Sequence, residues 1–220
     1  MRLHLKVYTP GTKIPFDHQH LMVGTIHKWL GEQNPYHGQP ALFSFSNLKI
    51  TRVAEDGFIV QDMTEFFISS CDSELLRRLL AGIQADPEMF HGLRVDEVFL
   101  LPTPDLSSRV LFYPASPILI KRRIGDRIEH VLYKDPEAGA FLKETLLKKM
   151  KQAGRSVSDD FQIHFDAHSP RARTRLVNYR GISNRANICP VVILGSNEVK
   201  QFAWEVGLGN STGIGFGAIK

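Results

Sequence analysis

Five of the nine histidines in this 220-residue chain lie within its first 37 residues, and three of them, His20, His27 and His37, are the first candidates for chemistry. A helix that presents His27, followed by a loop that presents His37, can place two imidazoles on either side of one reacting group. Imidazoles titrate near neutral pH, so one can accept a proton while the other donates one. Such a pair suits RNA cleavage by a ribose 2′-hydroxyl. Either histidine can instead be an ordinary packing residue, and spacing alone leaves both interpretations open.

The sequence does not favour a metal site. His20 and His27 are seven residues apart, and no cysteine joins them. Cys71 and Cys189 lie far apart and make no metal-ligand spacing, so we expect them to be buried thiols in a reducing compartment. No Walker A or GxSxG motif is present. We therefore expect proton-transfer chemistry with no metal and no cofactor.

Positive charge is concentrated in the middle-to-late part of the chain. Residues 121–185 carry 15 Lys and Arg against 8 Asp and Glu, whereas residues 1–120 carry 10 against 13. Such a basic segment is typical of a protein that binds a polyanion. Two groups within it could follow a phosphate backbone: Lys121, Arg122 and Arg123, and the alternating Arg171, Arg173 and Arg175. The alternative for the second group is a solvated edge strand protected by its charge.

Five glycines crowd the last sixteen residues, at Gly207, Gly209, Gly213, Gly215 and Gly217. Glycine is used where φ must be positive or where a backbone must come close to another chain. This glycine-rich tail (residues 205–220) could press its backbone N–H groups against a phosphodiester chain. It could equally be a turn that leads into a C-terminal strand at 216–219.

Hydrophobic periodicity predicts the elements that position these groups. In the first half we expect a strand at 2–8 with Arg2 on its polar side, and a helix at 18–32 with Asp17 as its N-cap. Strands at 42–50, 57–60 and 65–69, a helix at 73–85 and a strand at 95–101 then complete a ferredoxin-like order.

The second half predicts a similar order after a linker at 102–108. Its expected elements are strands at 109–113, 117–122 and 127–133, a helix at 136–152, strands at 161–165, 173–179 and 190–194, a helix at 197–206 and a strand at 216–219. We therefore predict an α+β protein of two tandem ferredoxin-like (RRM-like) βαββαβ domains, 1–104 with the histidines and 109–220 with the glycine-rich loop. No apolar run is long enough to span a bilayer, so we expect a cytoplasmic protein without a membrane partner.

Both ends of the chain resemble one known family. The segment Phe16–Leu30, His37 and the strand at Leu42–Ser46 resemble the start of the CRISPR-associated repeat endoribonucleases, the Cas6 family. The segment from Trp204 to Gly217 is similar to that family's C-terminal glycine-rich signature. The resemblance runs from end to end.

The resemblance implies a specific reaction and specific partners. Family members cleave CRISPR precursor RNA within each repeat, without metal, by 2′-hydroxyl attack that leaves a 2′,3′-cyclic phosphate. His37 stands at the family's catalytic histidine, and His27 stands where many members carry tyrosine. Repeat RNA, as precursor and as product, is the implied partner, and a CRISPR interference complex and a second copy of the chain are further candidates.

One family position departs from the pattern. A residue that is often lysine falls directly before Leu42 and is Ala41 here. Lys28, Lys49 or Arg52 could supply the transition-state cation instead. A non-catalytic relative that binds repeat RNA is the main alternative. A ferredoxin-like protein that binds a small ligand or another protein is a further one.

Overall fold

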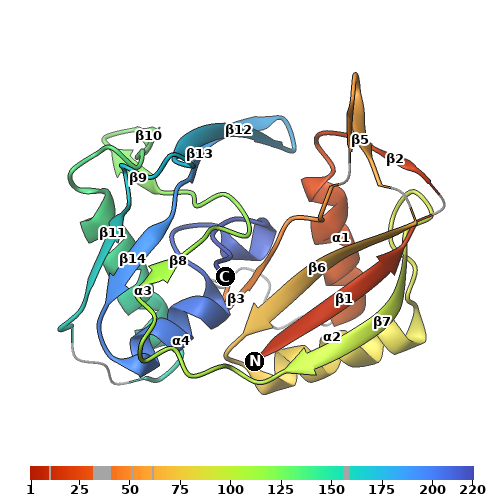
Figure 1. The fold of residues 1–220 in the computed structure, drawn as a ribbon, viewed down its shortest axis with the longest axis horizontal. Coiled ribbons are helices and arrows are strands. Elements are labelled where there is room, and N and C mark those ends of the chain that lie inside the picture. Colours follow the sequence, from red (N-terminus) through yellow and green to blue (C-terminus); the bar gives the residue numbers. More distant parts are fainter. Residues whose placement is uncertain (10, 32–40, 51, 61, 156–158) are drawn as a thin grey trace.

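The first half folds into a four-stranded antiparallel sheet covered by two helices on one face (Figure 1). The computed structural model describes residues 1–9, 11–31, 41–50, 52–60, 62–155 and 159–220. The sheet has the order β3-β6-β1-β7, and its strands are β1 (Arg2–Tyr8), β3 (Phe43–Phe45), β6 (Met63–Ser70) and β7 (Arg94–Leu101). The covering helices are α1 (Gln19–Leu30) and α2 (Ser73–Ala85). This strand order is that of a ferredoxin-like unit, as the sequence predicts.

Alternation along β1 and an apolar stripe on α2 explain how this layer forms. Leu3, Leu5 and Val7 all point from β1 into the core and are buried. The α2 helix has the predicted bounds, because the Asp72 carboxylate accepts hydrogen bonds from the backbone N–H groups of Glu74 and Leu75. Burial of these apolar side chains supplies the main stabilising free energy of the layer.

Several details of the first half differ from prediction. His18, not Asp17, occupies the N-cap of α1, and its side chain makes no capping hydrogen bond. The helix ends at Leu30 because Gly31 takes φ 83°. The strand predicted at 42–50 is shorter, since only β3 pairs with β6. A small separate sheet contains β2 (Lys13–Ile14), β4 (Arg52–Ala54) and β5 (Gly57–Ile59).

The second half repeats the ferredoxin-like order in a looser form. Its sheet has the order β11-β14-β8 and contains β8 (Leu111–Phe112), β11 (Gln162–Phe165) and β14 (Val191–Leu194). The helices are α3 (Ala138–Gln152) and α4 (Asn197–Val206). Two hairpins extend from this half: β9 (Lys121–Ile124) with β10 (Arg127–His130), and β12 (Arg173–Tyr179) with β13 (Ile182–Ile188), of which β13 was not predicted.

The glycine-rich tail takes the position of the fourth strand beside β8. The backbone N–H of Tyr113 donates to the carbonyl of Lys220 at 2.9 Å, and the N–H of Lys220 donates to Tyr113 at 2.8 Å. The strand predicted at 216–219 is therefore only an isolated bridge between Pro114 and Ile219. Closely spaced glycines interrupt a regular ladder, which explains the difference.

Each half has its own hydrophobic core. One cluster of buried residues extends along the chain from Leu3 to Val95, and a second extends from Leu106 to Ile219. The domain boundary at 102–108 stays a prediction. This segment lies between the two clusters, although one of its residues, Leu106, belongs to the second cluster. Among the helices that the structure describes, none is long and apolar enough to cross a membrane.

Two helical glycines provide a test of how α1 is held. A methyl group on Gly82 of α2 would collide with the backbone of Trp29 in α1, whereas a methyl group on Gly24 of α1 would meet no atom within 4 Å. We expect Gly82→Ala to lower the free energy of unfolding by about 2 kcal/mol, because the two helices must separate.

The matched control is Gly24→Ala, which we expect to raise that free energy by roughly 0.5–1 kcal/mol, since alanine favours helix more than glycine does. Urea unfolding followed by circular dichroism measures both values. Equal effects of the two substitutions would contradict the close α1–α2 packing.

Candidate RNA-binding and cleavage site

His27 lies near the C-terminal end of α1, and its side chain is half-buried. The end of the helix is fixed by Trp29, whose Nε1 donates to Asp86 O at 2.8 Å, and by Lys28, whose Nζ lies 2.7 Å from the Asp86 carboxylate. His37 lies outside the described residues, so its position relative to His27 stays a prediction. Within the described ranges, no three His, Cys, Asp or Glu side chains form a group that could hold a metal ion.

The candidate transition-state cations lie on three different elements. Lys28 of α1 pairs with Asp86, as described above. Lys49, which follows β3, pairs with Glu65 at 3.1 Å. Arg52 begins β4 in the small separate sheet and is exposed. Both lysines must therefore exchange a carboxylate partner before they could bind a phosphate.

The glycine-rich tail is folded tightly against the protein's own backbone. The N–H groups of Gly207, Gly215 and Gly217 donate to the carbonyls of Ala203, Thr212 and Pro117. A methyl group on Gly209 or Gly217 would collide with the carbonyl of Leu119 or Leu208, and both residues have φ 74°. These three N–H groups are therefore bonded within the protein, although we predicted that the tail presents its amides to RNA. In this structure the glycines allow close backbone packing.

The same tail also packs against the first half, close to the start of α1. Gln19 of α1 donates through Nε2 to Ile214 O at 2.5 Å, and Thr212 Oγ1 donates to Ala41 O at 3.3 Å. Gly213 is half-buried, and a methyl group there would lie 2.7 Å from the Ala41 side chain. Residues from opposite ends of the chain thus form one surface.

The first basic group is not a uniform row. Arg122 donates to the Glu144 carboxylate at 2.5 Å, and its guanidinium lies 3.8 Å from the centre of the Phe141 ring. Lys121 is half-buried, and burial lowers its pKa. Arg123 is exposed. Arg122 is therefore held against α3, whereas Arg123 is the member of this group whose side chain is most accessible to a ligand.

One member of the second basic group, Arg175, lies at a cleft between the two halves. Arg173 and Arg175 lie on β12, whereas Arg171 lies in the preceding turn, 5.5 Å from the centre of the Tyr113 ring. Arg175 lines a cleft of about 320 Å³ together with Phe16 and residues at the start of α1. Burial, and then the neighbouring Arg173, lower the pKa of Arg175. This lowered pKa indicates a site that an anion would stabilise.

Sequence reasoning missed the first-half wall of this cleft. Phe16 is 48% exposed although it is a large aromatic residue, and its ring packs edge-on against Phe58 with the ring centres 4.9 Å apart. His18 lines the same cleft, and burial lowers its pKa, which favours the neutral imidazole. The only sequence signal was an aromatic residue beside proline in a predicted loop.

Sequence reasoning also missed the role of Arg2, which the alternation places on the polar side of β1. Its guanidinium lies between the rings of Phe67 and Trp204, 3.6 Å and 3.4 Å from their centres. It donates to Ser69 Oγ at 2.6 Å and to the carbonyls of Trp204 and Ile219 at 3.1 Å and 2.8 Å. Burial, and then Arg109, lower the pKa of Arg2 to about 9. Periodicity cannot show that another part of the chain covers a strand face.

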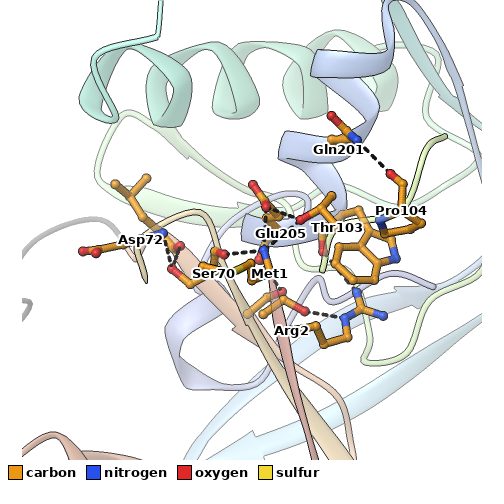
Figure 2. A network of polar contacts seen from close by, with 12 residues as sticks. Met1, Arg2, Ser70, Asp72, Thr103, Pro104, Gln201 and Glu205 are labelled. Carbon is orange, nitrogen blue, oxygen red and sulfur yellow. Dashed lines mark hydrogen bonds and ion pairs between the residues drawn. The ribbon is translucent and has the colours of Figure 1, made fainter. Parts of the chain in front are cut away.

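A polar network next to Arg2 continues the contact between the halves (Figure 2). The Glu205 carboxylate lies 2.6 Å from the Met1 amino group and accepts a hydrogen bond from Thr103 Oγ1 at 2.5 Å. Gln201 of the same helix donates to Pro104 O at 2.8 Å. The α4 helix is therefore tied to both the start of β1 and the connection between the halves.

Close packing of the tail predicts a large effect on stability. We expect Gly217→Ala to lower the free energy of unfolding by roughly 3 kcal/mol, because the methyl group adds a backbone collision to the strain of a positive φ. The control is Gly125→Ala, at a hairpin turn with φ 59° and no atom within 4 Å of the added methyl. That change should cost only about 1 kcal/mol from φ strain. Thermal unfolding compares the two, and similar losses would argue against the close contact.

One family model and several named relatives match this chain. A family model described as "CRISPR associated protein Cas6, C-terminal" matches residues 101–220. The chain is 26% identical to the Pyrococcus furiosus protein named "Putative CRISPR-associated endoribonuclease-like protein Cas6", with 100% of this chain and 98% of the relative covered. It is 25% identical to "CRISPR-associated endoribonuclease Cas6 1" of Methanocaldococcus jannaschii, with 100% and 92% covered.

Solved structures share the fold along the whole chain. One is described as "CRISPR associated protein Cas6" and matches with a TM-score of 0.85 at 22% identity, covering 100% of this chain and 98% of the other. A second, described as "An RAMP protein binding different RNA substrates", matches with a TM-score of 0.86 at 21% identity and the same coverage. These matches confirm the tandem ferredoxin-like α+β fold.

Proposed function

Because the chain belongs to the Cas6 family of CRISPR-associated proteins, we propose that it is an endoribonuclease that cleaves CRISPR precursor RNA within its repeats. The observation that carries this proposal is the match of the family model to residues 101–220. Full-length similarity to relatives that are named CRISPR-associated endoribonucleases supports it. The mature guide RNA is then held or passed to an interference complex, and dimerisation stays a prediction.

The proposed reaction is an internal transesterification. One histidine removes the proton of the ribose 2′-hydroxyl, and the 2′-oxygen forms a bond to the adjacent phosphorus. The phosphorus–O5′ bond breaks, and the second histidine protonates the departing O5′. The products are a 2′,3′-cyclic phosphate and a 5′-hydroxyl, so the reaction consumes no water. The proposed mechanism uses the two histidines and no metal ion. We assign these two roles to His37 and His27, with His37 contributing more.

We assign RNA binding to the cleft between the halves and to the basic residues around it. Arg175 of β12 supplies positive charge on one wall, and Arg173 on the same strand and Arg171 in the preceding turn carry further positive charge outside the cleft lining. Phe16 offers an exposed ring on which a base can stack. Lys121 and Arg123 of the other hairpin would contact more distant phosphates. The glycine-rich tail supports this surface through its packing, and Gly213 is its most exposed candidate contact.

The first experiment tests the nucleophile and the histidines together. We expect purified protein to cut its repeat RNA in EDTA, and a 2′-deoxy substitution at the cut site to abolish cleavage while binding is retained. His37→Ala should lower the single-turnover rate by roughly 100-fold or more, the usual range for a general acid or base. His27→Ala should have a smaller effect.

The matched control for this experiment is His20→Ala, on the same helix as His27. His20 Nδ1 contacts the backbone carbonyl of Asp17 at 2.7 Å, so we assign it no part in the reaction. Gel analysis of the cleavage products, with phosphatase treatment to detect the cyclic end, measures each rate. Cleavage of the 2′-deoxy substrate, or full dependence on added metal, would contradict the mechanism.

A second candidate function is repeat-RNA binding without efficient cleavage. Two observations favour it: Ala41 stands where the family often has lysine, and the Pyrococcus furiosus relative carries the name "endoribonuclease-like". The two lysines available as substitutes, Lys28 and Lys49, are each paired with a carboxylate. Binding by this candidate would use the same cleft.

Substitution of Ala41 separates the two candidates. Ala41 is half-buried beside Gly213, at the point where the chain enters β3. We expect Ala41→Lys to raise the single-turnover rate by about 10-fold or more, because it adds a cation for the developing negative charge. Ala41→Met controls for side-chain length, and the rate of Ala41→Lys should exceed that of Ala41→Met by the same factor. Tight binding with no cleavage by the wild-type protein, rescued only by Ala41→Lys, would establish the second candidate.

A further inference from the structure

Lys149 is a buried lysine in the part of α3 that packs behind the glycine-rich tail. It is one of four lysines on α3, yet only 7% of the residue is exposed. Its Nζ donates to three oxygen atoms: Val206 O at 3.3 Å, Gly207 O at 3.2 Å and Thr212 Oγ1 at 3.2 Å. Two of these acceptors are the last carbonyl of α4, at Val206, and that of its C-cap, Gly207, where a cation interacts favourably with the helix dipole.

The surroundings of Lys149 contain no matching negative charge. Across the described part of the chain, no carboxylate forms an ion pair with it. The nearby Cys71 has a pKa raised to about 11 by burial, so its thiol is neutral. Glu205, which directly precedes Val206 on α4, is paired with the Met1 amino group. Burying a lysine in such a place is costly, so the position requires an explanation.

Hydrogen bonds connect Lys149 to the first half of the protein. Thr212 accepts from Lys149 and donates its own hydroxyl hydrogen to Ala41 O at 3.3 Å, which uses the hydroxyl as both acceptor and donor. Thr212 is buried as well. Ala41 is followed closely by β3, which pairs with β6. A contact chain therefore extends from α3 to the entrance of β3.

We propose that Lys149 is a positioning residue for RNA cleavage: through the end of α4 and Thr212, it sets the position of the tail against Ala41. This inference rests on the proposed endoribonuclease function. Lys149 itself is buried beneath the surface and does not touch RNA. Its effect should therefore appear in the rate of cleavage more than in RNA affinity.

The protonation state of Lys149 alters this positioning. A protonated amine has three hydrogens for the three acceptors, whereas a neutral amine has two and leaves one oxygen without a donor. Burial lowers the pKa of Lys149 to about 7. The protonated form, which makes all three contacts, is therefore present below that pH and is lost as the pH rises through it. The contribution of Lys149 to the rate should decline in the same direction.

The test compares Lys149→Met with Lys148→Met, its neighbour on α3. The Lys148 side chain is 70% exposed and pairs with Glu144, so this control removes the same charge outside the contact chain. At about pH 6.5 we expect Lys149→Met to lower the single-turnover rate roughly 10- to 100-fold, because a small misplacement of the reacting groups has an effect of this size. The RNA dissociation constant should change less than about threefold. Lys148→Met should behave as wild type. The difference between wild type and Lys149→Met should shrink towards about pH 8.5.

A second variant and a second measurement keep the outcome decisive. Thr212→Val removes the hydroxyl with little change of shape, and it should lower the cleavage rate as Lys149→Met does. Because both residues act through one contact chain, the double variant Lys149→Met with Thr212→Val should be no slower than either single variant. Hydrogen exchange should increase in residues 41–45 for both variants and not for Lys148→Met. Wild-type rates and unchanged exchange in both variants would overturn the proposal. A wild-type protein that binds but never cleaves would refute the proposed function, and the exchange measurement would still decide the link to Ala41.

Discussion

The two halves of this protein are joined by a buried cation that each half only partly surrounds. The Arg2 guanidinium lies between Phe67 of the first half and Trp204 of the second, and it donates to two carbonyls near the end of the chain. Without those carbonyls the buried guanidinium would keep only Ser69 Oγ as an acceptor, and a buried charge with too few partners costs several kcal/mol. The orientation of the two halves therefore depends on the start of β1. The shape of the cleft between the halves depends on the same contact.

The glycine-rich tail depends on this junction and extends it. Ile219 O accepts from Arg2, and a few residues earlier the tail contacts α1 through Gln19 and the entrance of β3 through Thr212. Glycine is needed at Gly209 and Gly217 because backbone carbonyls occupy the space of a side chain. A glycine signature of this kind therefore reflects backbone packing as much as ligand contact. It explains how residues from both ends of the chain can form one site.

Much of the fold could be predicted from the sequence because it depends on local pattern. The bounds of α2 follow from the Asp72 cap and its leucine stripe, and β1 follows from strict alternation. Arg2 and Lys149 could not be predicted, because their burial depends on what another segment places over them. In the sequence, Arg2 alternates with apolar residues of β1, and Lys149 is one of four lysines on α3. The cleft wall at Phe16 was missed for the same reason, and His37 stays a prediction outside the described residues.

Buried cations thus occur where helix and strand ends of the two halves meet. Arg2 and Lys149 both donate to carbonyls at the end of α4 or in the tail, and burial lowers the pKa of both. Hydrophobic side chains could fill the same volume, but they would leave these carbonyls without donors, since each helix end has unpaired oxygens. Hydrogen bonds to these carbonyls also fix the direction in which the two segments approach each other, whereas apolar contacts do not. A protein that must hold groups from two halves at one cleft gains from contacts that permit only one arrangement.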